Sequence, residues 1–178
     1  MKKWLEIIVS MVLMLFMGSI YAYSVFRQSV MVSYETNLFL SGLPYMTALA
    51  FYALSMFVTG KLIKRDNTSV VAVSGLLLIA FGFLISGLST SLLGLLIGYG
   101  MFAGFGVGLT YSVPIFRLQQ RKSQHTGFYT GLILLGFGAS PLVTANLIQW
   151  FLSFGLKTAF LYMAYMFLVL SPLGFIYQ

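Results

Sequence analysis

The sequence predicts an all-α membrane protein in which six helices cross the bilayer. Two observations carry this prediction. Of the 178 residues, 60% are hydrophobic and only 7% are charged, whereas charged residues make up about a quarter of a soluble domain. The few charges also divide the chain into uncharged stretches of roughly 20 residues or more, the length that one crossing needs. A soluble globular domain and an intrinsically disordered chain are both excluded.

The charged residues give the approximate limits of each span. The stretch between Asp66 and Arg117 holds 50 uncharged residues. That is about twice the length of one crossing, so the chain must turn back within it. The polar cluster Ser86–Ser91 is the predicted turn. The six predicted helices are Trp4–Met31, Leu38–Lys64, Ser69–Leu88, Leu92–Phe116, His125–Leu152 and Lys157–Tyr177.

The basic residues predict the orientation. With the N-terminus in the cytoplasm, eight of them lie at cytoplasmic helix ends and only Lys157 lies outside, as the positive-inside rule requires. Both termini are then cytoplasmic, and we expect a multi-pass protein of the plasma membrane. The net charge of +7 follows from this topology and does not indicate a nucleic-acid partner. The eight residues are Lys2, Lys3, Lys61, Lys64, Arg65, Arg117, Arg121 and Lys122.

Side chains that carry chemistry are scarce. The chain has three acidic residues, one histidine and no cysteine, which excludes cysteine metal sites, disulfide scaffolds and most acid–base enzymes. The glycines of Gly104–Gly108 lie within an apolar span, so they do not form a phosphate-binding loop or a dinucleotide fingerprint. We therefore expect no enzymatic activity, no metal and no cofactor, and a chain surrounded by membrane lipid.

Two similar segments indicate an internal repeat. The triplet Tyr23–Val25 in the first helix recurs as Tyr111–Val113 in the fourth, 88 residues later. A unit of three helices reverses its direction in the membrane, so the second copy is inverted relative to the first. The two repeats are about 1–89 and 90–178, within a single bundle. Inverted three-helix repeats are typical of secondary transporters; a chance match in a chain rich in these residues is the alternative.

Three motifs resemble the oxalate/formate antiporter branch of the major facilitator superfamily. They are GSIYAYSVF at Gly18–Phe26, GFGVGLTY at Gly104–Tyr111 and GFYTG at Gly127–Gly131. The resemblance implies the N-terminal half of a twelve-helix carrier that moves a small mono- or dicarboxylate by alternating access. It also implies that helices one, two, four and five line the cavity and that helices three and six face lipid. The implied partners are a small organic anion and either the missing C-terminal half or a second copy.

Two further hypotheses about the whole chain stay open beside this one. In the first, the chain is a truncated, non-transporting remnant or an assembly protein of the membrane. In the second, two copies form a homodimeric six-helix carrier. The polar and glycine stripes of the sequence do not separate these hypotheses from a half-carrier.

The loop after the second helix departs from the superfamily pattern G-x-L-x-D-R-x-G. Lys64 stands at the acidic position and Asn67 at the second glycine. In the superfamily this acid belongs to a cytoplasmic gate, so its loss puts such a gate in question here. An acid two residues away is the candidate replacement. The residues assigned to the gating loop are Gly60, Leu62, Arg65 and Asp66.

Candidate substrate-binding residues lie mainly on the first helix. At 100° per residue, one stripe runs from Met14 and Met17 to Gln28 and offers hydroxyl, amide and soft apolar groups. Arg27, near the outer end, either attracts carboxylates or extends to lipid headgroups. Packing of the stripe against a neighbouring helix is the alternative to a cavity wall. The predicted substrate-binding residues are Tyr21, Ser24, Arg27, Gln28, Tyr111 and Ser112.

Glycines at helical spacing predict close packing between helices. One stripe lies on the fourth helix and another on the fifth. Small residues at such spacings let two helix backbones approach each other inside a membrane. The predicted packing glycines are Gly18, Gly100, Gly104, Gly108, Gly127, Gly131 and Gly138.

Overall fold

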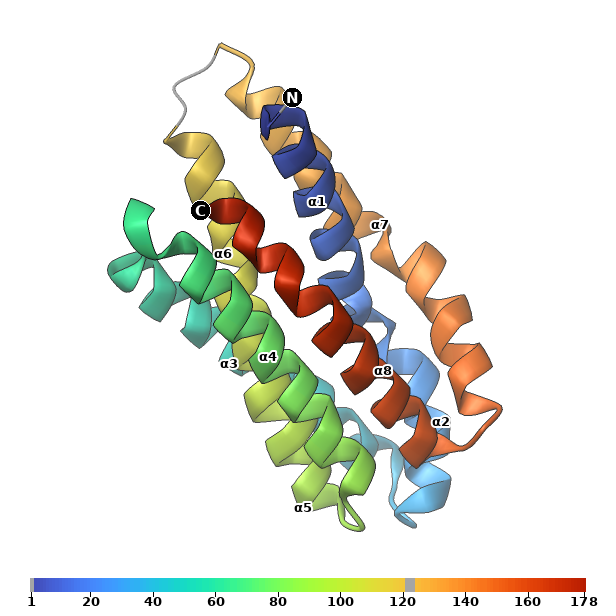
Figure 1. The fold of residues 1–178 in the computed structure, drawn as a ribbon. Helices are drawn as coiled ribbons and strands as arrows, with labels where there is room; N and C mark the ends of the chain where they lie inside the picture. The colour runs from blue at the N-terminus through green and yellow to red at the C-terminus, as the bar shows by residue number, and fades with distance from the viewer. Residues whose placement is uncertain (1, 121–123) are drawn as a thin grey trace.

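The computed structural model describes residues 2–120 and 124–178 and is helical along most of this part of the chain (Figure 1). Arg121 and Lys122, two of the predicted cytoplasmic cations, lie outside the described residues. The elements are α1 (Lys2–Met17), η1 (Gly18–Ala22), α2 (Tyr23–Ser33), α3 (Leu38–Leu62), η2 (Arg65–Asn67), α4 (Thr68–Leu88), α5 (Leu92–Leu95), η3 (Leu96–Ala103), α6 (Gly104–Gln119), α7 (Thr126–Leu152), α8 (Leu156–Leu170) and η4 (Ser171–Tyr177).

Six helical segments of the described chain are long and apolar enough to cross a membrane, which confirms the predicted fold class. Their mean hydropathy lies between 1.4 and 2.4. Each boundary lies within four residues of its predicted position. The six segments are called spans 1 to 6 and consist, in order, of α1–η1–α2, α3, η2–α4, α5–η3–α6, α7 and α8–η4.

Polar side chains hold the helix ends in the turns between spans. The side chain of Asn37 caps α3 by accepting a hydrogen bond from the backbone N–H of Leu40 at 2.9 Å. Ser91 caps α5 in the same way, so the chain turns back within the predicted polar cluster. Gly155 precedes α8 with a φ of 102°, a conformation that glycine adopts without the strain a Cβ would cause.

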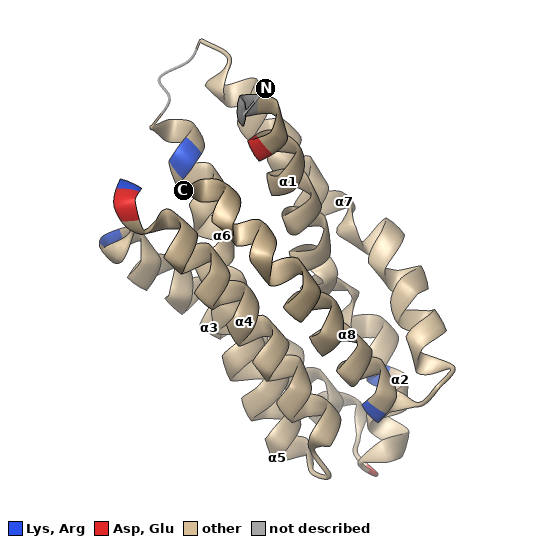
Figure 2. Cartoon of the chain, viewed as in Figure 1, with Lys and Arg blue, Asp and Glu red and all other residues tan. Residues whose placement is uncertain are grey.

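Spans that are distant in sequence lie side by side. α4 packs along α8, α1 along α7 and α3 along α6, and α4 also contacts α6. Both termini lie at one end of the bundle (Figure 1). The charged residues of the described chain are confined to the two ends, and the middle of the bundle carries none (Figure 2). This distribution suits a bilayer, because a charge at its centre is costly. The side of the membrane that each end faces stays a prediction.

An aromatic core joins spans 1, 3, 4 and 6. Phe26 stacks on Phe160 with 4.7 Å between ring centroids, and Phe83 stacks on Phe167 at 5.6 Å. Tyr99 contacts both Phe83 and Phe160. Aromatic pairs in such arrangements contribute about 0.5–1.5 kcal/mol each beyond the burial of their area. These contacts fix the four spans to one another.

Four of the candidate packing glycines lie where helices approach closely. Gly18 faces α7, and Gly100, Gly104 and Gly108 face α3. A Cβ placed on Gly104 would lie 2.5 Å from the carbonyl oxygen of Ala48, which is a steric clash. The absence of a side chain therefore lets α6 and α3 meet backbone to backbone.

The glycines of α7 differ from the prediction. A Cβ on Gly127, Gly131 or Gly138 would meet no described atom within 4 Å, so these residues face away from the other described spans. Gly136 makes the close contact instead, because a Cβ there would lie 2.8 Å from the carbonyl oxygen of Met11. The reason is geometric. At about 100° per residue, the nine residues from Gly127 place Gly136 on the opposite side of the helix.

Candidate functional site

The predicted stripe on span 1 divides in the structure. Tyr21, Ser24 and Gln28 are exposed, whereas Met14 and Met17 are fully buried. The cause is the 3₁₀-helix η1, in which the chain advances by about 120° per residue instead of 100°. Its five residues turn the rest of the span by about 100° relative to an unbroken α-helix. The two methionines belong to the core, and only the polar half of the stripe faces outward.

Tyr21 and three other aromatic side chains, from four different spans, lie together. Tyr21 (η1), Tyr52 (α3), Tyr111 (α6) and Phe137 (α7) are called the aromatic cluster. Phe137 lies edge-on to Tyr21 at 5.3 Å and to Tyr111 at 4.9 Å between centroids. Tyr52 lies edge-on to Tyr111 at 5.5 Å. Phe137 is 6% exposed and Tyr21 is 41% exposed, so the cluster has a buried base and an open edge.

The surroundings of the aromatic cluster offer hydrogen-bonding groups. Ser24 and Gln28 follow Tyr21 along the exposed face of span 1. Ser112 follows Tyr111, but its hydroxyl donates a hydrogen bond to the carbonyl oxygen of Gly108 at 2.9 Å. The Ser112 oxygen is therefore left to accept, not to donate, a hydrogen bond from a ligand. Ring faces beside a few polar groups are the usual lining of a site for a small organic molecule.

Arg27 lies near the C-terminal end of span 1, where its guanidinium rests against the start of α3. Its Nη2 donates to the carbonyl oxygen of Leu38 at 2.6 Å, and its Nε donates to Oγ of Ser41 at 3.3 Å. Within the described chain no carboxylate pairs with it. Because these two bonds use only part of the five N–H groups of a guanidinium, Arg27 keeps donors for an anion.

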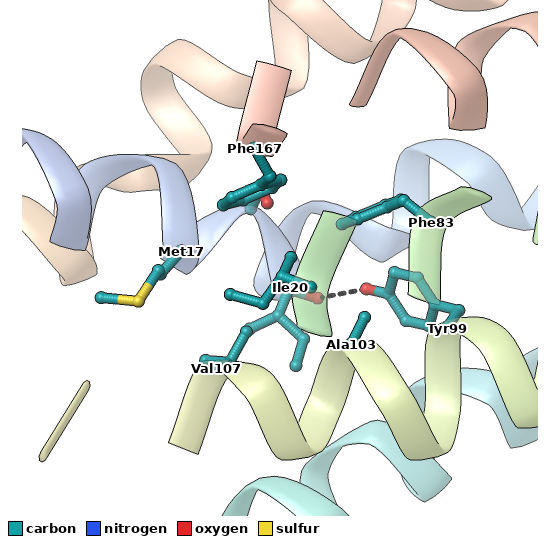
Figure 3. A pocket seen from close by; sticks show the side chains of 9 residues that line it. Met17, Ile20, Phe83, Tyr99, Ala103, Val107 and Phe167 are labelled. Atoms are coloured by element: carbon teal, nitrogen blue, oxygen red, sulfur yellow. Dashed lines mark hydrogen bonds between the residues drawn. The ribbon is translucent and has the colours of Figure 1, made fainter. Parts of the chain in front are cut away.

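An enclosed cavity lies deeper, between spans 1, 3, 4 and 6 (Figure 3). Met17, Phe83, Val107 and Phe167 are among the residues that line it, and the Tyr99 hydroxyl points toward Ile20 at its edge. Its volume is about 10 Å³. Since one water molecule needs about 10–15 Å³ on this measure, the cavity does not hold an organic substrate.

Asn67 closes the candidate gating loop. Its side-chain oxygen accepts a hydrogen bond from the backbone N–H of Lys64 at 2.7 Å, and its side-chain nitrogen donates to the carbonyl oxygen of Leu62 at 3.0 Å. The residue at the second glycine position of the motif thus folds the loop back on itself. The Leu62 side chain is exposed, and a Cβ on Gly60 would meet no described atom within 4 Å.

A polar recess of about 660 Å³ opens at the end of the bundle that carries the termini. Within it Arg117 Nε donates to Oε1 of Glu6 at 3.3 Å, and the Glu6 residue is 5% exposed. This ion pair joins span 1 to span 4. The residues that line the recess are Glu6, Arg65, Asp66, Ser69, Arg117, Tyr177 and Gln178. Arg65 and Asp66 of the candidate gating loop therefore line the same recess as the ion pair.

Two features of this site were not predicted from the sequence. Glu6 and Arg117 are 111 residues apart; the available signal was an acid at the start of the first helix and a base at the end of the fourth, on the same predicted side of the membrane. Tyr52 and Phe137 complete the aromatic cluster. The available signal was that they lie in the second and fifth predicted helices, which the family resemblance assigns to the cavity. In the described part of the chain, no three His, Asp or Glu side chains gather as a metal site would require.

Comparison with known proteins gives one class of relative. Over 128 residues, 71% of this chain, the sequence is 34% identical to monocarboxylate transporter 11 of Homo sapiens and 33% identical to that of Mus musculus. The chain is similar to monocarboxylate transporters. Over 83 residues it is 35% identical to monocarboxylate transporter 13 of Rattus norvegicus. No protein-family model matches the sequence.

The matches cover only part of these relatives. They span 27% of the human protein, 29% of the mouse protein and 19% of the rat protein, so the chain spans about a quarter of the length of the curated relatives it matches. The relatives are carboxylate transporters by name. With its six apolar spans, the chain is a multi-pass membrane protein.

Proposed function

We propose that this chain is the N-terminal six-helix half of an alternating-access carrier for a small carboxylate in the plasma membrane. The observation that carries the proposal is its 34% identity to a monocarboxylate transporter over 71% of its length. The favoured substrates are monocarboxylates. The motifs that resemble oxalate/formate antiporters keep dicarboxylates among the substrates to be tested.

The aromatic cluster and Arg27 support this proposal by their chemistry. Arg27, with donors left over at the outer end of span 1, attracts the carboxylate. The open edge of the cluster, about 9 Å further along the span by helix rise, contacts the organic part of the anion. The four residues of the cluster come from spans 1, 2, 4 and 5, the helices that the family resemblance assigns to the cavity.

The packing of the spans supports two inverted repeats, 1–89 and 90–178. Span 1, the first helix of one repeat, packs on span 5, the second helix of the other. Span 4 packs on span 2 in the reciprocal way. A pseudo-two-fold axis in the membrane plane relates two repeats in this way, because it pairs the first helix of each repeat with the second helix of the other.

Transport assays test the proposal. Uptake of labelled pyruvate, lactate and oxalate is measured in cells that express this chain together with a C-terminal six-helix half, and in proteoliposomes that contain the 178-residue chain alone. We expect uptake in the cells and none in the proteoliposomes, because the anion site requires two facing halves. Tyr111→Ala, which opens the aromatic cluster, reduces uptake, whereas Tyr162→Ala in span 6 serves as the matched control.

Each other outcome separates the hypotheses. Absence of uptake of all three anions in cells, with the protein present in the membrane, contradicts a carboxylate carrier and favours a remnant or assembly protein. Uptake by the chain alone, together with crosslinked dimers, favours the homodimeric carrier. Uptake by the chain alone at a dilution that excludes dimers contradicts the half-carrier.

A further inference from the structure

A second site lies on the face of the bundle formed by spans 3 and 6. An apolar groove of about 400 Å³ runs along the seam between α4 and α8. Ala80 and Ala164, each 7% exposed, form its floor. Larger side chains rise on both sides as walls: Leu77, Phe81 and Leu84 from α4, and Leu161, Tyr165 and Leu168 from α8.

The groove exists because the two helices are close at its ends and carry small residues between them. Toward one end, a Cβ on Gly87 would lie 2.8 Å from the side chain of Leu161. Toward the other, a Cβ on Gly174 would lie 2.8 Å from the side chain of Val73. Between these two contacts the small side chains of Ala80 and Ala164 leave space on the outer surface of the seam.

One charged residue lies on the same side of α8 as the groove. Lys157 is exposed and lies four residues before Leu161, so the two occupy one face of the helix. From Lys157 to Leu168 the helix rises about 16 Å. That distance matches one leaflet, half of the roughly 30 Å hydrocarbon thickness of a bilayer.

We propose that this groove binds a membrane phospholipid, with one acyl chain over Ala80 and Ala164 and the phosphate at Lys157. The walls are uncharged and suit hydrocarbon, and the lysine supplies the complementary charge for the phosphate. A transmembrane helix of a partner protein fits less well, because it would need a seam along the whole span, and the lining residues run only over 77–84 and 161–168. The proposal is independent of the transport function.

Native mass spectrometry of the purified, delipidated chain tests this site. The protein is offered phosphatidylglycerol or a diacylglycerol with the same acyl chains in detergent. We expect one tightly retained phosphatidylglycerol per chain and weaker retention of the diacylglycerol. Ala164→Phe fills the groove and abolishes retention, and Lys157→Gln lowers the affinity about fivefold, the effect of one lysine–phosphate attraction. Excess inorganic phosphate does not displace the lipid, since it cannot fill the groove.

Two matched variants control for altered surface and charge. Leu142→Phe enlarges an exposed side chain on α7, and Lys64→Gln removes a lysine next to Arg65, which lies beside the C-terminal residues at the other end of α8–η4 from Lys157; both retain lipid like the unmodified chain. If Ala164→Phe does not fold, Lys157→Gln decides, because its side chain is exposed. Retention of no phospholipid by the unmodified chain overturns the proposal, as does equal retention by Lys157→Gln and Lys64→Gln.

Discussion

The phenol of Tyr99 donates a hydrogen bond to the carbonyl oxygen of Ile20 at 3.1 Å, deep in the bundle (Figure 3). Ile20 lies in η1, the 3₁₀-helix of span 1, and Tyr99 lies in η3, a π-helix of span 4. The bond thus joins the two irregular segments of the first and fourth spans. Since buried carbonyl groups need partners in a membrane, Tyr99 stabilises the distorted backbone of span 1.

Tyr99→Phe removes only the hydroxyl and leaves the ring in the aromatic core. We expect a loss of about 1 kcal/mol in the free energy of unfolding, because the Ile20 carbonyl loses this donor. Thermal unfolding of the purified protein in detergent measures it. Tyr165→Phe, at a tyrosine that is 67% exposed, serves as the control and leaves the transition unchanged. A Tyr99→Phe protein as stable as the control would show that the bond has no net effect.

Gly104→Ala and Gly131→Ala form a matched pair of glycine substitutions. The first places a methyl group 2.5 Å from the carbonyl oxygen of Ala48, whereas the second places it where no described atom lies within 4 Å. We expect Gly104→Ala to destabilise the protein by about 1–3 kcal/mol through overpacking. Gly131→Ala is neutral or slightly stabilising, because alanine favours the helix. Equal unfolding temperatures of the two variants would contradict the close approach of α6 and α3.

The partly buried ion pair between Glu6 and Arg117 is tested by a double-mutant cycle. Arg117→Gln leaves the Glu6 carboxylate without this partner, and we expect a loss of about 1–3 kcal/mol of stability, because the pair is only partly buried. The double variant with Glu6→Gln recovers part of that loss, since neither charge then remains buried. Denaturation in detergent gives the four stabilities. Additive effects of the two single variants would mean that the side chains do not interact.

Arg27→Gln tests the proposed attraction of the anion. We expect weaker uptake of labelled carboxylate in expressing cells, with a higher KM, because the charge at the C-terminal end of span 1 is lost. Lys157→Gln removes a positive charge near the same end of the bundle and leaves the KM unchanged. Identical kinetics of Arg27→Gln and the unmodified protein would assign Arg27 to lipid headgroups or to packing against α3.

The spans were predictable because the bilayer imposes a simple rule. Charges cannot stay in hydrocarbon, so Glu6, Asp66, Arg117 and Lys157 mark span ends, and the turn near Ser91 follows from the excess length between two of these marks. The arrangement of the spans is less accessible, because apolar side chains of similar size favour many pairings. The sequence therefore predicts the limits of the membrane spans better than the contacts between them.

The candidate site shows where local periodicity fails. Met17 and Tyr21 share one stripe only if span 1 is an unbroken α-helix. The 3₁₀-helix η1 changes the turn per residue, so the two side chains face different sides. Nothing in Gly18–Ala22 required a 3₁₀-helix; the contact of Gly18 with α7 and the bond from Tyr99 depend on tertiary packing. The position of Gly131 on the outer side of α7 likewise depends on which side meets α1.

The aromatic core of Phe26, Phe83, Tyr99, Phe160 and Phe167 has a mechanical consequence. Rings interlocked among four helices resist sliding of any one helix, because each shift would open voids around several rings at once. Spans 1, 3, 4 and 6 therefore move together. In the proposed carrier, switching between the two sides of the membrane is therefore a tilting of these four spans together, not a sliding of one span past another.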